Sequence, residues 1–309
     1  MPLSPNLKDL ASRVSNRGRW GAADRRGTLN LIDDAAVVRG LAAARQGKVF
    51  SLAIPFDANG PQTGMIPGRI NPELEAVAVN MSFTGDPADF TTSDDVVKMG
   101  VQSCTHWDSL GHAGYEGELY NGIPDSTNTA AGASELGIDR FGAVVSRGVL
   151  LDVARARGVD ALEGGHAITG ADLDAAVDLA GVEIEAGDIL LVRTGHIQAF
   201  LGGDRARYAE QPSAGLSTQS IEWLRAQDVG AVATDTLIFE VWPPEDPAVF
   251  LPVHMIHLRD MGLVQGQNFN LEALAADSAD DGQYDCLLCA TPLPLTGSFG
   301  GPVAPTAIK

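Results

Sequence analysis

The sequence is poor in cysteine and in aromatic residues. Among 309 residues there are three cysteines, Cys104, Cys286 and Cys289, and only 6% of the residues are aromatic. Three cysteines cannot form a four-thiolate or two-plus-two zinc pattern, and an odd number argues against a secreted disulfide framework. We interpret C-L-L-C at 286–289 as part of a buried strand, because strand residues three apart point to opposite faces and cannot chelate one ion.

Positive charge is also scarce. Lys and Arg together number 21 against 40 Asp and Glu, so the formal net charge is −19. Such a chain repels nucleic acid and anionic membrane surfaces. No apolar run approaches the roughly 18 residues of a membrane span, and the polar start MPLSPNLKDL lacks a signal-peptide core. The sequence therefore predicts a cytoplasmic protein that binds neither nucleic acid nor membrane.

Internal repeats, a Walker loop and a GxGxxG turn are absent, which removes the common nucleotide-binding architectures. Short apolar runs and helical patterns alternate instead. We expect strands at 48–56, 75–83, 147–154, 187–195, 229–235 and 284–295, and helices at 34–46, 169–181, 217–230, from 254, and at 270–279. Asp33 and Ser217 are candidate N-caps. Several strand pairs lack an intervening helix, so we predict an α/β fold with a mixed sheet.

The charge is distributed unevenly along the chain. Residues 1–26 contain six basic and two acidic side chains and carry +4, whereas residues 27–309 sum to −23. We therefore divide the chain into a basic N-terminal arm, 1–26, and a single domain, 27–309. We expect the arm to lie on an acidic surface, with a neighbouring subunit of a homodimer as our hypothesis. A solvated basic helix is the alternative.

Chemically competent side chains gather at 102–112. His106 and Asp108 are two residues apart and point the same way if the segment is extended, and Gln102 would join them. Imidazole with carboxylate suits zinc or manganese. His112 follows a short turn and could return to the same pocket as an acid or base. A lone His or Asp at a strand end often merely caps the backbone, but this explanation is weaker for the whole set.

Two further histidines, His254 and His257, share a helical face if their segment is helical, and spacing alone does not say which belongs to a site. The Gly- and Pro-rich stretch 58–72 is a long loop of the kind that often binds ligands.

The segment Q-S-C-T-H-W-D-S-L-G-H at 102–112 resembles the His-x-Gly-Thr-His-x-Asp-x-x-x-His signature of the cyclase family. These metal-dependent hydrolases include bacterial kynurenine formamidase and isatin hydrolase. RWGAADRRGTLNLI, YEGELYNG, HMIHLRDMGLVQGQNFNLEALAAD and PLPLTGSFGGPVAP extend the resemblance over nearly the whole chain. It implies a swivelling β/β/α fold, usually dimeric, with one or two zinc or manganese ions and metal-bound hydroxide that opens amides and related acyl bonds.

Carried over to this chain, the resemblance implies that His106 and Asp108 bind metal and that His112 handles protons. His254 matches a later histidine ligand, with His257 still open. Gln102 stands where the signature has its first His, and Gln267 stands where a late acidic residue is expected. Because an amide binds metal weakly and cannot accept a proton as a carboxylate does, we expect one ion per chain. Cys104 replaces the usual Gly.

Our hypothesis is a hydrolase that opens a small cyclic amide, imide, lactone or formamide. The predicted ligands are Gln102, His106, Asp108 and His254, the predicted catalytic residues are His112 and Gln267, and the predicted substrate wall is Trp20, Trp107 and Tyr120. The alternative is a metal-poor lyase, isomerase or cyclising enzyme that uses His112 and Asp108 as acid and base. A non-catalytic binding protein would leave the cluster unexplained.

Overall fold

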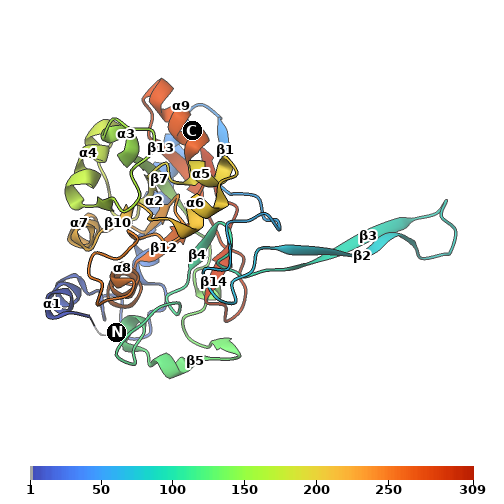
Figure 1. The fold of residues 1–309 in the computed structure, drawn as a ribbon, viewed down its shortest axis with the longest axis horizontal. Helices are drawn as coiled ribbons and strands as arrows, with labels where there is room; N and C mark the ends of the chain where they lie inside the picture. The colour runs from blue at the N-terminus through green and yellow to red at the C-terminus, as the bar shows by residue number, and fades with distance from the viewer. Residues whose placement is uncertain (1–2) are drawn as a thin grey trace.

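A computed structural model describes residues 3–309 and is built on one nine-stranded sheet (Figure 1). In spatial order the strands are β1 (Val49–Ser51), β15 (Thr306–Ile308), β13 (Asp285–Cys289), β7 (Val145–Asp152), β9 (Ile189–Arg193), β11 (Ala231–Thr234), β12 (Val264–Gln267), β4 (His106–Asp108) and β14 (Gly300–Pro302). The central four, from β7 to β12, are parallel, and the outer pairs are antiparallel. The α/β fold with a mixed sheet is confirmed.

Helices surround this sheet. They are α1 (Pro5–Val14), α2 (Asp34–Ala43), α3 (Val153–Ala156), α4 (Gly170–Ala180), α5 (Ile197–Leu201), α6 (Arg205–Glu210), α7 (Ile221–Gln227), α8 (Pro252–His254), the π-helix η6 (Met255–Met261) and α9 (Glu272–Asp281). Short 3₁₀ turns are η1 (Gly27–Leu31), η2 (Tyr120–Gly122), η3 (Asp125–Thr127), η4 (Ile138–Arg140) and η5 (Thr218–Ser220). Two-stranded ribbons pair β5 (Asn128–Thr129) with β6 (Gly132–Ala133) and β8 (Ala167–Ile168) with β10 (Gly215–Leu216).

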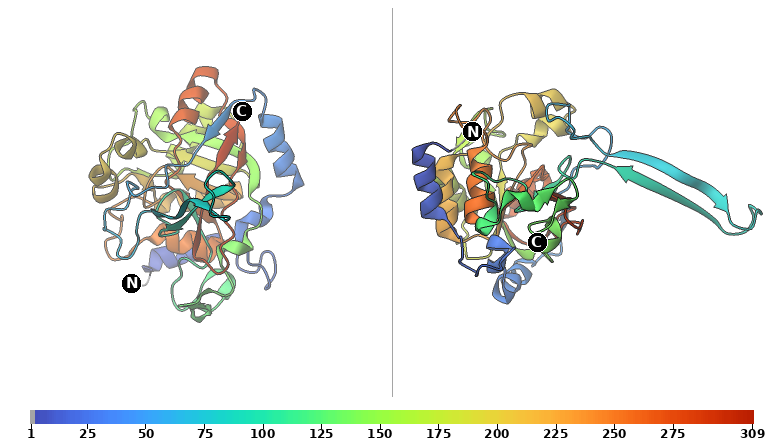
Figure 2. Two further views of the ribbon diagram at one scale, coloured as in Figure 1. Left: turned by 90° about the vertical axis from the view of Figure 1, so that its right-hand side faces the viewer. Right: turned by 90° about the horizontal axis from the view of Figure 1, so that it is seen from below.

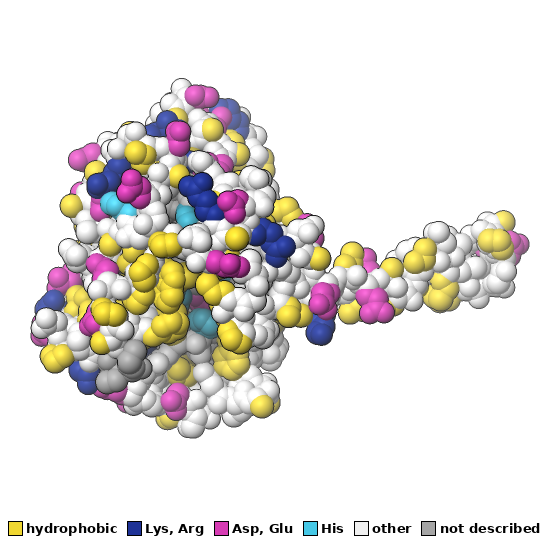
Figure 3. All heavy atoms as spheres, viewed as in Figure 1, with side chains coloured by type: hydrophobic (Ala, Val, Ile, Leu, Met, Phe, Trp, Pro, Cys, Tyr) yellow, Lys and Arg dark blue, Asp and Glu magenta, His cyan; other side chains and the backbone are white. Residues whose placement is uncertain are grey.

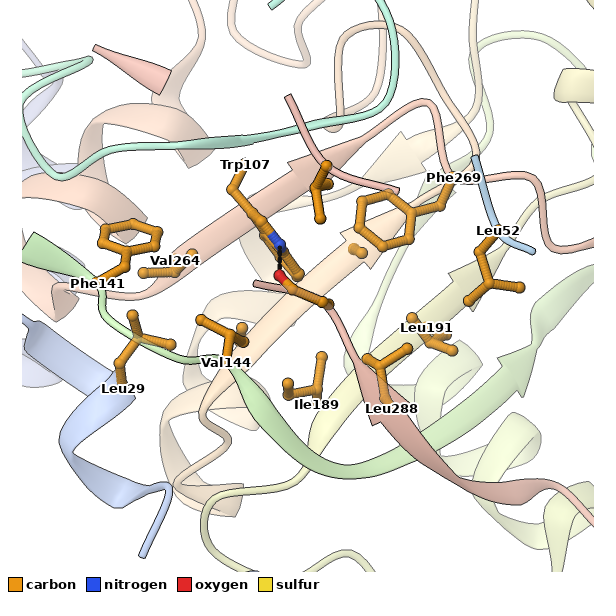
Figure 4. Packing of buried hydrophobic residues seen from close by; sticks show 14 of the residues in the cluster. Leu29, Leu52, Trp107, Phe141, Val144, Ile189, Leu191, Val264, Phe269 and Leu288 are labelled. Carbon is orange, nitrogen blue, oxygen red and sulfur yellow. Dashed lines mark hydrogen bonds between the residues drawn. The ribbon is translucent and has the colours of Figure 1, made fainter. Parts of the chain in front are cut away.

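The hydrophobic core lies on both faces of the sheet, because alternate strand residues point in opposite directions. On β9, Leu190 and Val192 pack in the cluster that holds apolar residues of α4, α7 and η6. Ile189 and Leu191 pack in the other cluster, with residues of α9. Figure 4 shows this second cluster around Trp107 and Phe269. Burial on both faces explains why β9 and β11 are mostly apolar runs, whereas β12 has the sequence VQGQ.

The predicted caps Asp33 and Ser217 are found at helix starts, and a third cap, Thr169, was not predicted. The Asp33 carboxylate accepts the backbone N–H of Ala36 at the start of α2, and Thr169 and Asp172 form a capping box on α4. Ser217 caps the 3₁₀ turn η5, which runs into α7, so the predicted helix is a composite. α2 ends at Ala43, before the expected stop near Gly47.

The expected strand over 48–56 is only three residues long, since the chain leaves the sheet after Ser51. Residues 58–72 contain neither helix nor strand, as predicted for a loop. They lead into β2 (Glu73–Ser82), which pairs antiparallel with β3 (Thr91–Lys98). This β2–β3 hairpin projects far from the body, as Figures 1 and 2 show.

The N-terminal arm lies on its own chain. Leu10 and Val14 of α1 are buried in the cluster that includes α7 and η6. Arg13 pairs with Glu222 at 2.8 Å and Arg19 pairs with Asp228 at 2.6 Å. The acidic surface predicted for the arm is therefore found within the same chain. No helix in residues 3–309 is long and apolar enough to cross a lipid bilayer.

Candidate active site

The short strand β4 presents the first site residues. Because β4 is extended, His106 and Asp108 point to one side and Trp107 to the other, and all three are fully buried. The Trp107 indole N–H donates to the carbonyl oxygen of Ala290 at 2.7 Å, and the ring packs edge-on against Phe269 (Figure 4). β4 thus anchors its polar residues through a core aromatic on the opposite face.

His106 has a fixed orientation. Its Nδ1 lies 2.7 Å from the carbonyl oxygen of Cys104, which can only accept a hydrogen bond, so Nδ1 carries a proton. Nε2 then faces Asp108 Oδ1 at 3.4 Å, and neither of these buried atoms has a hydrogen-bond partner. A lone pair opposite a carboxylate oxygen is unfavourable unless positive charge lies between them.

The other oxygen of Asp108 is well supplied with donors. Gln267 Nε2 donates to Asp108 Oδ2 at 2.7 Å, and Gln265 Nε2 donates at 3.3 Å. Gln267 Nε2 also lies 3.4 Å from His254 Nε2, so one amide group stands between the carboxylate and this imidazole. Burial raises the pKa of Asp108, but His112, His106 and His254 outweigh it and hold the pKa below its ordinary value. Asp108 is therefore ionised.

His254 is oriented by a carboxylate that the sequence analysis missed. Its Nδ1 lies 2.6 Å from Glu240 Oε1, and Glu240 also accepts the backbone N–H groups of Val253 and His254 where α8 begins. Nε2 is thereby directed toward Asp108, whose Oδ2 is 4.0 Å away. Glu240 follows β11 in the segment TLIFE, and no local spacing rule connects it to a histidine 14 residues later.

His257 is not part of this site. Its ring is fully buried, packs edge-on against Phe239 at 5.7 Å between centroids, and lines neither cavity at the site. Burial, aided by the nearby His254, lowers the pKa of His257 to about 3. Of the two histidines, His254 is the one that lines the cavities beside Asp108.

Gln102 does not share the strand. Residues 101–105 form turns and bends, so the expected extended segment from Gln102 to His106 is not found. Gly300 of β14 pairs directly with Asp108, and a Cβ placed on Gly300 would lie 2.8 Å from Gln102 Nε2. The amide therefore packs over β14 on the face of the sheet that carries the Asp108 side chain, as expected, although it arrives there through a turn. Within residues 3–309, no hydrogen bond joins the Gln102 side chain to the side chain of His106 or of Asp108.

The three aromatics predicted to form a substrate wall lie elsewhere. Trp107 is in the core. Tyr120 is fully buried and its hydroxyl donates to Asp24 at 2.8 Å, while the ring of Trp20 lies beneath the guanidinium of Arg19. None of them is among the described residues that line the two cavities. This part of the site prediction is corrected.

A cavity of 370 Å³ opens beside the histidines, which is large enough for a small molecule. Its polar lining residues are Arg69, His112, His254 and Gln267, and its apolar lining residues are Met65, Ile66, Leu237, Ile238, Trp242, Phe250 and Leu251. A second, more open cavity of 730 Å³ shares His112 and His254.

His112 and Arg69 complete the polar end. His112 Nε2 lies 3.7 Å from Asp108 Oδ1. Burial lowers the pKa of His112. The negative charge of Asp108 acts in the opposite direction but is outweighed, so the pKa of His112 lies below its ordinary value. Burial likewise lowers the pKa of Arg69, against the attraction of Asp108. Arg69 was not predicted as a site residue, although its loop, 58–72, was predicted to bind ligand.

Cys104 contributes through its backbone. Its carbonyl oxygen accepts from His106 Nδ1 and, at 2.9 Å, from Asn268 Nδ2. The thiol is fully buried, and burial raises its pKa to about 11. Cys104 is therefore a neutral thiol rather than a nucleophile.

The donors on β4 fit a divalent ion. His106 Nε2 and Asp108 Oδ1 are an imidazole nitrogen and a carboxylate oxygen, both buried and unpaired. Two such ligands at about 2.1 Å in a tetrahedral shell would lie roughly 3.4 Å apart, which is the separation seen here. No group of three or more His, Cys, Asp or Glu side chains in residues 3–309 is already arranged to hold an ion. His106 and Asp108 could thus supply two donors to an ion, and its other positions would fall to neutral groups, water or substrate.

These features define an α/β protein with a buried His–x–Asp centre beside a small-molecule cavity. A family model described as "Putative cyclase" matches residues 50–241. The chain belongs to this cyclase family. A structure of a novel cyclase is 36% identical, with a TM-score of 0.87, and the match covers 96% of this chain and 99% of that one.

More distant structures share the fold. Isatin hydrolase A from Ralstonia solanacearum is 19% identical, with a TM-score of 0.62, over 88% of this chain and 95% of its own. A predicted metal-dependent hydrolase from Bacillus stearothermophilus is 16% identical, with a TM-score of 0.51, over 84% and 97%. No curated protein matches the chain. The comparisons therefore agree with the resemblance inferred from residues 102–112.

Proposed function

We propose that this protein is a hydrolase that opens a small cyclic amide, imide, lactone or formamide with the help of one divalent ion, zinc or manganese. The observation that carries the proposal is the pair of unpaired, buried atoms His106 Nε2 and Asp108 Oδ1, 3.4 Å apart. The isatin hydrolase and the metal-dependent hydrolase that share the fold support the same class of reaction.

His106 and Asp108 would hold the ion, which when bound polarises a carbonyl group and lowers the pKa of water. Gln267 keeps its amide N–H groups on Asp108 Oδ2 and beside His254 Nε2. It therefore orients both partners, as a neutral donor, without acting as a base. Of the predicted catalytic pair, Gln267 receives a positioning role in this proposal.

His254 is the general base in this proposal. Glu240 accepts a hydrogen bond from the Nδ1–H group of His254. Nε2 therefore carries the lone pair, which is directed at the site. This carboxylate–imidazole pair can take a proton from the attacking water, and the charge that forms on the ring is stabilised by Glu240. The sequence analysis predicted His254 as a metal ligand. In this proposal its Nε2, 4.0 Å from Asp108 Oδ2, takes up a proton instead.

His112 and Arg69 act on the substrate side. Both line the 370 Å³ cavity, and the lowered pKa of His112 keeps its imidazole neutral near pH 7. As a neutral imidazole, His112 can relay a proton: one ring N–H passes to the departing nitrogen or oxygen while the other ring nitrogen takes up the proton that His254 removed from the water. The Arg69 guanidinium faces the same space and suits an oxyanion or the carboxylate that ring opening produces. The apolar lining fits a flat, uncharged ring.

A second candidate is the metal-poor lyase, isomerase or cyclising enzyme. It is favoured by one observation: no three His, Cys, Asp or Glu side chains among residues 3–309 already form an ion site. His112 and the ionised Asp108 would then be the acid and base.

A ring-opening assay distinguishes the two. Cyclic amides, imides, lactones and formamides should be tested with protein that has been chelated and then resupplied with zinc or manganese. We expect turnover that is lost on chelation and restored by one ion per chain. Turnover that is unchanged after chelation but abolished by His112→Ala would favour the second candidate and contradict the proposal.

A further inference from the structure

The basic N-terminal arm docks on η6, the π-helix that directly follows His254. Its helix α1 packs against η6 and shares an apolar cluster with it. Just after α1, the backbone N–H of Asn16 donates to the carbonyl oxygen of Asp260 at 2.8 Å. The buried side chain of Asn16 donates to the carbonyl oxygen of Met261, also at 2.8 Å. The arm thus satisfies carbonyl groups at the end of η6 that lies farthest from His254.

The loop 113–118, which directly follows His112, lies at the surface. None of its residues is buried, and the side chain of His112 is 24% exposed. Figure 3 shows histidine side chains among hydrophobic ones on the viewed face of the body. Within residues 3–309, no backbone hydrogen bond joins this loop to residues 254–261. The distance between the loop and η6 therefore depends on contacts between side chains.

Four side chains join the loop to η6. Arg259 of η6 donates to Glu118 of the loop at 2.9 Å and to the adjacent Asp260 at 2.6 Å. Its guanidinium also lies over the ring of Tyr115, 4.1 Å from the centroid. The Tyr115 hydroxyl donates to Asp260 at 2.8 Å. We call Tyr115, Glu118, Arg259 and Asp260 the Arg259 clamp, which combines charge-assisted hydrogen bonds with a cation–π contact.

The arm supports the clamp from outside. Arg17 pairs with the same Glu118 carboxylate at 3.0 Å, and Lys8 pairs with Glu116. The side chain of Arg17 is 57% exposed, whereas that of Arg259 is 16% exposed. Because water weakens ion pairs at the surface, Arg259 makes the stronger contact with Glu118. Arg259 is therefore the central residue of the clamp.

The clamp connects two parts of the lining of the 730 Å³ cavity. Residues 112–116 line this cavity, and so do His254 and Met255 at the start of η6. The rings of His112 and His254 are 6.5 Å apart between centroids, with 52° between their planes. Proton transfer requires donor and acceptor within hydrogen-bond reach, directly or through one water. The spacing of these two rings therefore matters for any proton that passes from one to the other.

We propose that Arg259 is a positioning residue, which holds the loop 113–118 against η6 and so sets the spacing of His112 and His254. This inference rests on the proposed function, in which His112 takes up the proton that His254 removed from water. Among the described residues, Arg259 lines neither cavity, so it acts through the histidines and not on the substrate. Without its guanidinium the buried Asp260 carboxylate would lose its cation and the loop would lose its strongest tie to η6.

Steady-state kinetics of ring opening, with zinc or manganese supplied, test the proposal. Arg259→Met should lower kcat about tenfold and leave KM within about twofold, because the histidines move while the 370 Å³ cavity does not. Arg259→Lys keeps the charge but not the planar fork, so it should recover part of the lost kcat. Arg19→Met is the matched control. Arg19 also binds a carboxylate, both oxygens of Asp228, and lies over the ring of Trp20, but it contacts neither the loop nor η6.

Hydrogen exchange gives a readout that needs no turnover. Tyr115 and Glu118 donate their backbone N–H groups to each other's carbonyl oxygens, at 3.2 and 3.1 Å. These amides should exchange about tenfold faster in Arg259→Met and at the native rate in Arg19→Met. Tyr115→Phe removes one hydroxyl group only and serves if Arg259→Met does not fold. It should lower kcat about threefold with KM unchanged, since one hydrogen bond of the clamp is lost.

The outcomes separate this inference from the proposed function. Native kcat in Arg259→Met, or an equal loss of kcat in Arg19→Met, would overturn the positioning role while the hydrolase activity stands. A native chain that opens none of the substrates would contradict the proposed function. In that case unchanged exchange of the loop amides in Arg259→Met would overturn the clamp as well.

Discussion

The two oxygen atoms of Asp108 lie in opposite surroundings. Oδ1 faces His106 Nε2 at 3.4 Å and His112 Nε2 at 3.7 Å without a hydrogen bond, whereas Oδ2 receives N–H groups from Gln267 and Gln265. One side is short of positive charge and the other is satisfied by neutral amides. If the proposed function is right, we expect the cation to bind on the Oδ1 side of Asp108 only.

The largest effect is expected from the Oδ1 side. Asp108→Asn and His106→Ala should each remove the ion and lower kcat/KM by roughly 10³-fold or more, since a metal supplies several kcal/mol to the transition state. Metal analysis and the ring-opening assay on the same samples give both readouts. Retention of a stoichiometric ion in either variant would break the proposed assignment.

The second largest loss of activity is expected from removing the Glu240 carboxylate, which hydrogen-bonds His254. Glu240→Gln should keep the ion but lower kcat by about 10²-fold, because the imidazole loses both its orientation and the charge that stabilises its protonated form. Glu245→Gln is the matched control, because Glu245 hydrogen-bonds Ser217 at 2.9 Å and lines neither cavity. Equal losses in both variants would point to general destabilisation instead.

A smaller change is expected at the cavity. Arg69→Met should raise KM for ring-opening substrates by about tenfold with the ion retained, since a charged hydrogen bond contributes about 1.5–3 kcal/mol. Arg140→Met, at a surface ion pair with Asp139, should change neither constant. An unchanged KM in Arg69→Met would remove this guanidinium from substrate binding.

The pH dependence of the activity tests the role of His112, which lies on the Oδ1 side of Asp108. Because burial lowers the pKa of His112, its imidazole becomes protonated only at pH values below the ordinary 6.5. Activity should therefore be full near pH 7 and fall on acidification, with a midpoint below pH 6.5 that changes in the residual activity of His112→Ala. A midpoint at or above pH 6.5 would contradict the lowered pKa.

The sequence predicted this centre unevenly. His106 and Asp108 were correctly paired because residues two apart on a strand share a face. Apolar runs marked the parallel strands β7, β9 and β11 but not β12, whose sequence is VQGQ. Gln102 was expected to arrive along an extended segment, but β4 starts only at His106, and Gln102 reaches the same face of the sheet through a turn. Glu240 and Arg69 were missed because they reach the site from distant parts of the chain. Trp107 was misread, because an aromatic next to two site residues on a strand points into the core.

The central claim is that a cation binds beside Asp108 Oδ1 but not beside Oδ2. The most direct test of this claim is the ion content of Gln267→Glu. In the native protein a neutral amide stands between Asp108 Oδ2 and His254 Nε2. A carboxylate there would repel Asp108 until a second cation binds. The zinc content found by elemental analysis after dialysis against zinc should therefore rise from one ion per chain in the native protein to two in Gln267→Glu. Two ions in the native protein, or one in both proteins, would contradict the account.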